Sequence, residues 1–259
     1  MCLLIAIHRV LPEWPLVVAA NRDEWLARPA VPMTTLQSDA PRIIGGRDLQ
    51  AGGTWAAINQ HGVVAALTNN PLATPQHVGG PAKKSRGKLP ILLAQAESAE
   101  LATAQLSATI DPSEYNPCWL LVADRQTLHY CALSGQRLET QRLPSGIYVL
   151  ENRPLDQSAK AKRVRDAVTE VLHPEISLDQ LFDQLKAILA DHRRPNSTQT
   201  AKSSASLVDR LSAVCVHEDG YGTRSSLLVA LPAELGAETP IRYADGPPCR
   251  STWQSAEAF

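Results

Sequence analysis

The second residue of the chain is a cysteine, in the opening stretch MCLLIAIHRV. An initiator methionine is removed efficiently when the residue after it is small, and cysteine is small. Removal of Met1 would leave Cys2 with a thiol, of ordinary pKa about 8.5, and a free α-amine, of ordinary pKa about 7.7 to 8.0. A proton can pass between two such groups near neutral pH, so Cys2 would supply nucleophile and base together. The alternative is that Cys2 is a small apolar residue at the start of a buried strand.

The polar stretch NRDE, residues 21–24, directly follows the apolar run VVAA. The permanent positive charge of Arg22 would favour a thiolate, and the carboxylate of Asp23 could orient an α-ammonium group. The same residues are typical of a solvated turn after a strand, and that alternative stays open.

Three more polar residues lie in or near other predicted strands: Asn69 in LTNN, Asn152 in VLENRP and Arg224 in YGTRSS. Acyl transfer needs hydrogen-bond donors aimed at the developing oxyanion, and asparagine amides can serve as such donors. Asparagine is also common in turns, so neither Asn69 nor Asn152 is diagnostic alone.

The positioning elements follow from hydrophobic patterning and turn residues. Apolar runs predict strands at 3–9, 15–21, 118–125, 128–135 and 146–152. Hairpins are predicted for 53–58 with 63–70 around NQHG, and within 211–232 around Asp219 and Gly220. Helical spacing predicts one or two helices in 86–110, and amphipathic helices at 159–172 and 177–194, the last with Ser177 as N-cap.

The order of these elements does not alternate strictly between strand and helix, so we expect an antiparallel α+β fold with helices covering sheet faces. We expect one domain over residues 1–259, with the polar segment 193–206 as a mobile loop or a regulatory insertion. The paired glycines in IIGGRDLQAGGTW mark tight turns or close approaches, and they do not form the phosphate-binding pattern G-x-x-x-x-G-K-[ST].

Composition disfavours several classes of partner. Lys plus Arg number 25 against 26 for Asp plus Glu, so no strong attraction to nucleic acid is expected. The early apolar run at residues 3–7 falls far short of the roughly 20 residues that cross a bilayer, so we expect no membrane span and a cytoplasmic protein.

The five cysteines, at positions 2, 118, 131, 215 and 249, form no C-x-x-C motif. They indicate neither a disulfide framework nor a zinc knuckle, and we interpret Cys118, Cys131 and Cys215 as core residues. The stretch HEDG at 217–220 lacks the H-E-x-x-H spacing of a metalloprotease. We therefore expect no metal and no resident cofactor.

Several motifs, taken together and in order, resemble the NRDE family, also called the transport and Golgi organisation family. They are MC at the start, NRDE at 21–24, GGRD at 45–48, GTW at 53–55, LTN at 67–69, SRGKL at 85–89 and YGTRSS at 221–226. That family is similar to the N-terminal nucleophile hydrolases, so the resemblance implies a four-layer α/β/β/α sandwich of two antiparallel sheets.

The resemblance also implies roles for the candidate residues. Cys2 would be the nucleophile and, through its amine, the base, while Arg22 and Asp23 would set its protonation. The oxyanion hole would involve Asn69 and Asn152. Arg224 would lie near the thiolate.

Three interpretations remain after these arguments, of which the last is a structural or interaction protein whose Cys2 would be sealed in the core and unreactive. The first is an amidase or acylase that cleaves a non-peptide C–N bond of a small molecule through a thioester at Cys2. The second is a carrier of a hydrophobic ligand, haem or an acyl lipid, in a cleft lined by Trp14, Trp25 and Trp55. For haem, His8 would be the nearest axial ligand, although a hydrogen-bonded structural histidine is the simpler interpretation. The sequence does not predict an oligomeric state.

Overall fold

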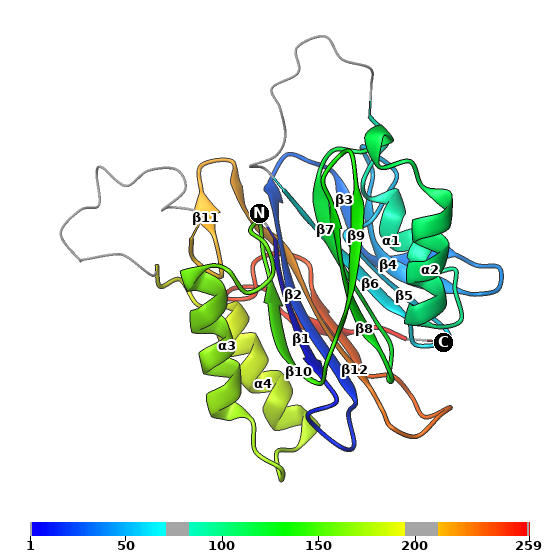
Figure 1. Ribbon diagram of the computed structural model, residues 1–259. Helices are drawn as coiled ribbons and strands as arrows, with labels where there is room; N and C mark the ends of the chain where they lie inside the picture. Colours follow the sequence, from blue (N-terminus) through cyan, green and yellow to red (C-terminus); the bar gives the residue numbers. More distant parts are fainter. Residues whose placement is uncertain (1, 71–82, 195–211, 258) are drawn as a thin grey trace.

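Two seven-stranded antiparallel sheets face each other in the computed structural model, which describes residues 2–70, 83–194, 212–257 and 259 (Figure 1). The first sheet has the order β10 (Gly146–Leu150), β1 (Cys2–His8), β2 (Leu16–Trp25), β12 (Tyr221–Leu231), β13 (Ile241–Ala244) and β14 (Trp253–Ser255), with β11 (His217–Glu218) paired to β12. The second runs β3 (Ala30–Gln37), β4 (Ile43–Asp48), β5 (Ala56–Asn59), β6 (Val64–Asn69), β7 (Cys118–Ala123), β8 (Leu128–Leu133) and β9 (Leu138–Leu143).

Alternation along the buried strands produces three apolar layers. In β1, Leu4 and Ala6 join the core between the two sheets, whereas Leu3 and Ile5 pack against helices. Such strands read as continuous apolar runs because both of their faces are covered.

The helices complete the outer layers. α3 (Ala159–Val171) and α4 (Leu178–Leu189) cover the first sheet, and α1 (Lys88–Leu93) and α2 (Ala99–Thr109) cover the second (Figure 1). The serine hydroxyl at the N-cap of α4, Ser177, accepts a hydrogen bond from the backbone of Gln180, whose side chain bonds back in a capping box. The predicted α+β class and the four-layer α/β/β/α sandwich are therefore confirmed.

One of the two predicted hairpins forms as expected, and the other has a shorter first strand than expected. β5 and β6 pair as expected around residues 59–62. The second hairpin turns at Gly220, with positive φ, but its first strand is reduced to the two residues of β11. The strand is short because the Cys215 N–H donates to the Asp191 carbonyl, just beyond α4, and not to a sheet neighbour. Most of the predicted loop 193–206 lies outside the described residues.

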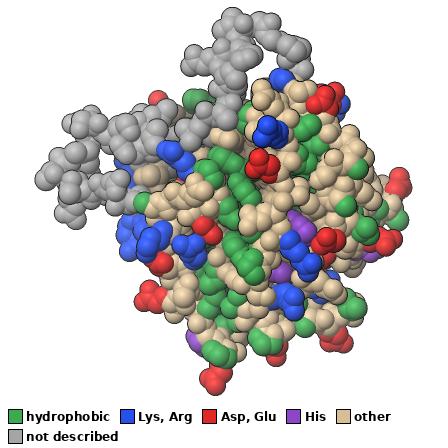
Figure 2. Space-filling model, viewed as in Figure 1, with side chains coloured by type: hydrophobic (Ala, Val, Ile, Leu, Met, Phe, Trp, Pro, Cys, Tyr) green, Lys and Arg blue, Asp and Glu red, His purple; other side chains and the backbone are tan. Residues whose placement is uncertain are grey.

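The face seen in Figure 2 carries Lys and Arg side chains interspersed with Asp and Glu side chains. That mixture matches the near-neutral sequence, whose formal net charge is −1. Among the described helices, none has the length and apolar character that a membrane span requires.

The first residue of NRDE, Asn21, ties β2 to the helical layer. Its Nδ2 donates to the carbonyls of Leu189, at 2.8 Å, and Val214, at 3.0 Å, and its Oδ1 accepts from Ser226 Oγ at 2.6 Å. All three bonds are buried, so Asn21 belongs to the scaffold.

We predict that Asn21→Ala lowers the free energy of unfolding by about 2 to 4 kcal/mol, because it leaves two buried carbonyls unpaired. Ser226→Ala removes a single bond and should lower it by about 1 kcal/mol. Urea denaturation followed by circular dichroism measures both values. Equal effects of the two variants would contradict the role given to Asn21.

Candidate active site

Cys2 stands at the start of β1, where its Cα pairs with that of Arg22 on β2. The residue is half-buried and lines a cavity of about 350 Å³. Cys2 therefore does not behave as a sealed core residue, in contrast to Cys118 and Cys131, which are fully buried. The cavity also receives side chains from β2, β4, β6 and the segments that precede β5 and α1.

Asn152 holds the backbone nitrogen of Cys2. The Cys2 N–H donates to Asn152 Oδ1 at 2.9 Å, and Asn152 Nδ2 donates to the carbonyl of Asn69. One amide side chain thus joins the nucleophile candidate in the first sheet to the end of β6 in the second. Asn69 itself lines the cavity with its side chain exposed.

Arg22 brings a buried positive charge to the cavity. Its Nη2 lies 3.7 Å from Asp48 and 3.8 Å from Glu24, and its guanidinium lies 4.5 Å from the centre of the Trp55 ring. Burial lowers the pKa of Arg22, and the nearby Cys2 acts in the opposite direction. Arg22 Nη1 is buried without a hydrogen-bond partner among the described residues.

Asp23 brings a buried negative charge close to the cavity, with its side chain on the opposite face of β2 from that of Arg22. Its Oδ1 accepts a hydrogen bond from Thr223 Oγ1 at 2.7 Å. Burial raises the pKa of the Asp23 carboxyl, and the Lys160 charge and the Thr223 hydroxyl oppose that rise. Lys160, on α3, is itself buried.

These groups shift the pKa of the Cys2 thiol in opposite directions. Burial raises the pKa of Cys2, and the negative charge of Asp23 adds to the rise. The backbone N–H of Asp23 and the positive charge of Arg22 lower it. A positive charge on the α-amine of a processed Cys2 would lower the thiol pKa further.

Asn152 and Arg224 are the predicted site residues that do not line this cavity, although Asn152 bonds the Cys2 nitrogen. Thr223 pairs with Asp23 and Ser225 with Arg22, so Arg224 occupies a bulge in β12 between them. Its Nε is buried without a hydrogen-bond partner among the described residues. The structure therefore brings together Cys2, Arg22, Asp23, Asn69 and Asn152 and places Arg224 outside their cavity.

Sequence reasoning missed Arg86, which lines the cavity and whose charge interacts with that of Cys2. Its Nη1 donates to the Pro117 carbonyl at 3.0 Å. Arg86 belongs to SRGKL, a motif noted for the resemblance but given no role. Asn116, a second amide on the cavity wall, was also missed.

The glycines of GGTW and SRGKL allow two loops of this wall to touch. A Cβ on Gly53 would lie 2.5 Å from the backbone of Gly87, and Thr54 donates its N–H to the Gly87 carbonyl at 2.8 Å. The predicted close approach at these glycines is confirmed, and it serves contact between two protein segments.

The residues proposed for a hydrophobic-ligand site are dispersed. Trp55 lines the cavity, Trp14 packs against the helix-covered side of the first sheet, and Trp25 is 60% exposed. His8 lies at the opposite end of β1 from Cys2. Its ring is buried and lines no part of the Cys2 cavity, but both ring nitrogens lack a hydrogen-bond partner among the described residues, so the expected hydrogen bond is not seen.

Solved structures share this fold. A conjugated bile acid hydrolase from Clostridium perfringens, in a mutant form, aligns with a TM-score of 0.56 and 11% identity, covering 100% of this chain and 97% of that one. A Caenorhabditis elegans orthologue of N-acylethanolamine-hydrolyzing acid amidase aligns with a TM-score of 0.52 and 9% identity, covering 88% and 92%. The likeness shows the N-terminal nucleophile hydrolase fold.

Relatives found by sequence similarity match most of this chain. The Transport and Golgi organization 2 homologue of Mus musculus is 28% identical over 233 residues, covering 84% of this chain and 82% of the relative. Its Homo sapiens counterpart is 27% identical over 236 residues, covering 85% and 83%. The family model for Transport and Golgi organisation 2 matches residues 1–237. The chain therefore belongs to the Transport and Golgi organisation 2 family.

Proposed function

We propose that this protein is an amidohydrolase that cleaves a non-peptide C–N amide bond of a small molecule through a thioester at Cys2. The observation that carries the proposal is the placement of Cys2. This residue lines a cavity of about 350 Å³ while its own nitrogen is held by Asn152. A nucleophile and an internal base would then share one fixed position once Met1 is removed.

The reaction follows from these groups. The α-amine of Cys2 accepts the thiol proton, directly or through water, and the sulfur attacks the amide carbonyl. The C–N bond breaks, the leaving nitrogen takes the proton, and the acyl group stays on sulfur as a thioester. Water then attacks the thioester, with the α-amine as base, and releases a carboxylic acid and the free thiol.

Two features of the wall support the acylation step. Asn69 and Asn116 line the cavity, and their side-chain amides are donors of the kind that stabilise an oxyanion. Asn152 is occupied with the Cys2 nitrogen and the Asn69 carbonyl, so we assign it the positioning of Cys2.

The charge of the cavity favours a polar substrate. Its lining cations are Arg22, Arg28, Lys83, Lys84 and Arg86, and its lining carboxylates are Asp23, Glu24 and Asp48. The cations are in excess, so we propose a substrate with a carboxylate or another anionic group beside its amide. Haem or an acyl chain would need a predominantly apolar pocket, and this lining disfavours the carrier. We also propose a cytoplasmic location, where the free cysteines would stay reduced.

We predict that purified protein lacks Met1 and that it hydrolyses at least one anionic amide in a panel, with an acyl adduct on Cys2 detectable by intact mass. Cys2→Ala should abolish both turnover and adduct. A form that keeps Met1, made by inserting a lysine after it, should lose turnover because its Cys2 nitrogen is a peptide nitrogen and no base.

Equal turnover in the processed and the Met1-retaining forms would refute the proposed base. A processed, foldable protein that binds panel amides without turnover would instead support the carrier.

We predict opposite effects of the two charges beside Cys2 on its rate of alkylation at pH 7.5. Arg22→Gln removes a charge that lowers the thiol pKa, so the rate should fall, about tenfold if the pKa of Cys2 rises by about one. Asp23→Asn removes a charge that raises this pKa and keeps the backbone N–H, so the rate should rise severalfold.

Mass spectrometry of iodoacetamide-treated protein, resolved by peptide, measures these rates. Arg22→Lys, which keeps the charge, and Arg28→Gln, which removes a different cavity charge, are the controls. Changes of the same sign for Arg22→Gln and Asp23→Asn would contradict the electrostatic assignment.

A further inference from the structure

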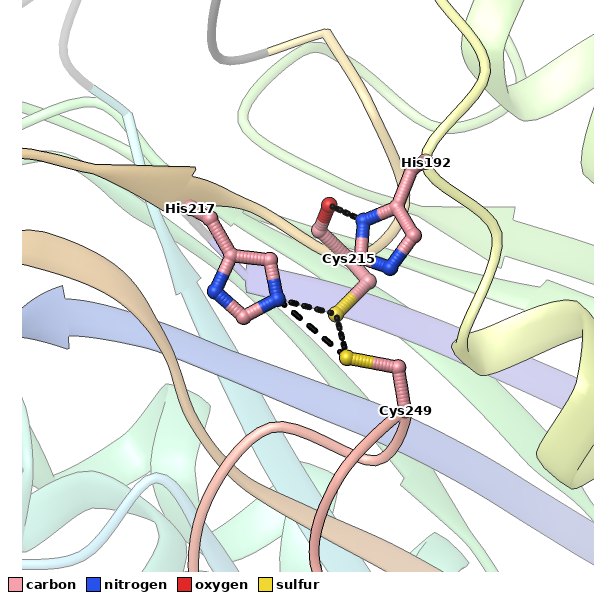
Figure 3. Close-up of side chains that lie close together, drawn as sticks. All are labelled: His192, Cys215, His217 and Cys249. Atoms are coloured by element: carbon pink, nitrogen blue, oxygen red, sulfur yellow. Dashed lines mark hydrogen bonds between the residues drawn. The ribbon is translucent and has the colours of Figure 1, made fainter.

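Four side chains with metal-binding atoms point toward one another: His192, Cys215, His217 and Cys249 (Figure 3). His192 follows α4, Cys215 and His217 flank Val216 at β11, and Cys249 lies between β13 and β14. One donor atom from each lies within 4.8 Å of every other. Cys215 is buried, while both histidines are exposed.

The spacing of these atoms fits a tetrahedral ion. Bonds of about 2.3 Å from zinc to sulfur and about 2.0 to 2.1 Å to nitrogen place two sulfurs about 3.8 Å apart and a sulfur and a nitrogen about 3.6 Å apart. Cys215 Sγ and Cys249 Sγ are 3.7 Å apart, and His217 Nε2 lies 3.7 Å from the first and 3.2 Å from the second. A disulfide would need its sulfurs at about 2.05 Å.

Hydrogen bonds to backbone carbonyl groups orient two members of the cluster. His192 Nδ1 lies 3.1 Å from the Cys215 carbonyl oxygen, which is an acceptor, so Nδ1 donates and Nε2 keeps its lone pair. The Cys215 N–H in turn donates to the carbonyl of Asp191 at 2.9 Å. A ligand histidine typically donates its second ring N–H to a carbonyl or carboxylate in this way.

We propose that His192, Cys215, His217 and Cys249 bind one zinc ion in a closed structural site. Two thiolates and two imidazoles are a ligand set that zinc prefers, and four protein ligands leave no position for substrate. Binding displaces the two thiol protons and leaves a site without net charge. The site is separate from the cavity at Cys2, none of whose lining residues belongs to it.

The ion would fasten three segments to one another: the end of α4, the β11 strand and the chain after β13. It would also stabilise the hydrogen bonds that hold the Asp23 side chain. The N–H of Val216, between two ligands, donates to Thr223 Oγ1 at 2.9 Å, and that hydroxyl donates to Asp23. Zinc would therefore stabilise the segment around Val216, which supports Asp23 through Thr223, without lining the Cys2 cavity.

The test is the metal content of the untagged full chain, purified without chelator and measured by inductively coupled plasma mass spectrometry. We expect about one zinc per chain. Cys249→Ser and His217→Asn should each lower the zinc content at least about tenfold. Both residues are exposed, so neither change opens a void in the core, and circular dichroism checks the fold.

Matched controls keep the result independent of the proposed reaction. His61→Asn changes an exposed histidine elsewhere, and Cys2→Ala removes the nucleophile, and both should retain zinc. Cobalt in place of zinc should give the thiolate charge-transfer band and strong visible absorption of a tetrahedral site, both lost in Cys249→Ser. Chelation should lower the melting temperature of the wild type and leave that of Cys249→Ser unchanged.

A wild-type chain that stays metal-free after equilibration with equimolar zinc would overturn the proposal, as would zinc retained when Cys249 and His217 are both replaced. A Cys215–Cys249 disulfide in the freshly isolated protein, seen as a mass lower by two hydrogens, would overturn it too. Stoichiometric iron or copper would overturn the choice of zinc.

Discussion

The amide of Asn152 is the contact on which the candidate site depends. It accepts from the Cys2 nitrogen in one sheet and donates to the Asn69 carbonyl in the other, and beside it Thr68 Oγ1 donates to the Glu151 carbonyl at 2.7 Å. The apolar contacts between the two sheets are non-directional, whereas a hydrogen bond constrains the distance and angle of the groups that it joins. These hydrogen bonds between the two sheets therefore hold the Cys2 nitrogen at one point of the cavity wall.

Most of the predicted strands and helices could be recognised from residues that are close together in the sequence. The hairpin of β5 and β6 was predicted because its turn residues and apolar runs are neighbours, and α4 because its apolar residues follow helical spacing directly after Ser177 as N-cap. β9 was missed because its sequence LETQRL is largely exposed and alternates poorly. The length of β11 was overestimated because the Cys215 N–H bonds to Asp191, two residues after α4, and no local sequence pattern records such a tertiary contact.

The site was predictable in its types of residue and less so in its geometry. Cys2 stood out by position, and Arg22 and Asp23 by following an apolar strand. Arg86 was missed because it reaches the cavity from a turn before α1, some 60 residues along the chain from those strands. The four proposed zinc ligands were missed for the same reason, since the pair Cys215 and His217 is completed by residues on either side of it in the chain.

The adjacency of Arg22 and Asp23 explains how opposite charges coexist beside one thiol. Successive residues of a strand point to opposite faces, so Arg22 reaches Trp55 and Asp48 between the sheets, while Asp23 bonds Thr223 on the other side. The two side chains therefore do not neutralise each other by direct pairing. Each has its own buried partners, and Cys2 experiences both charges. The pKa of a thiol near both charges can be raised or lowered by small changes in the partners of Arg22 or of Asp23. Burial in a uniform apolar core could only raise it.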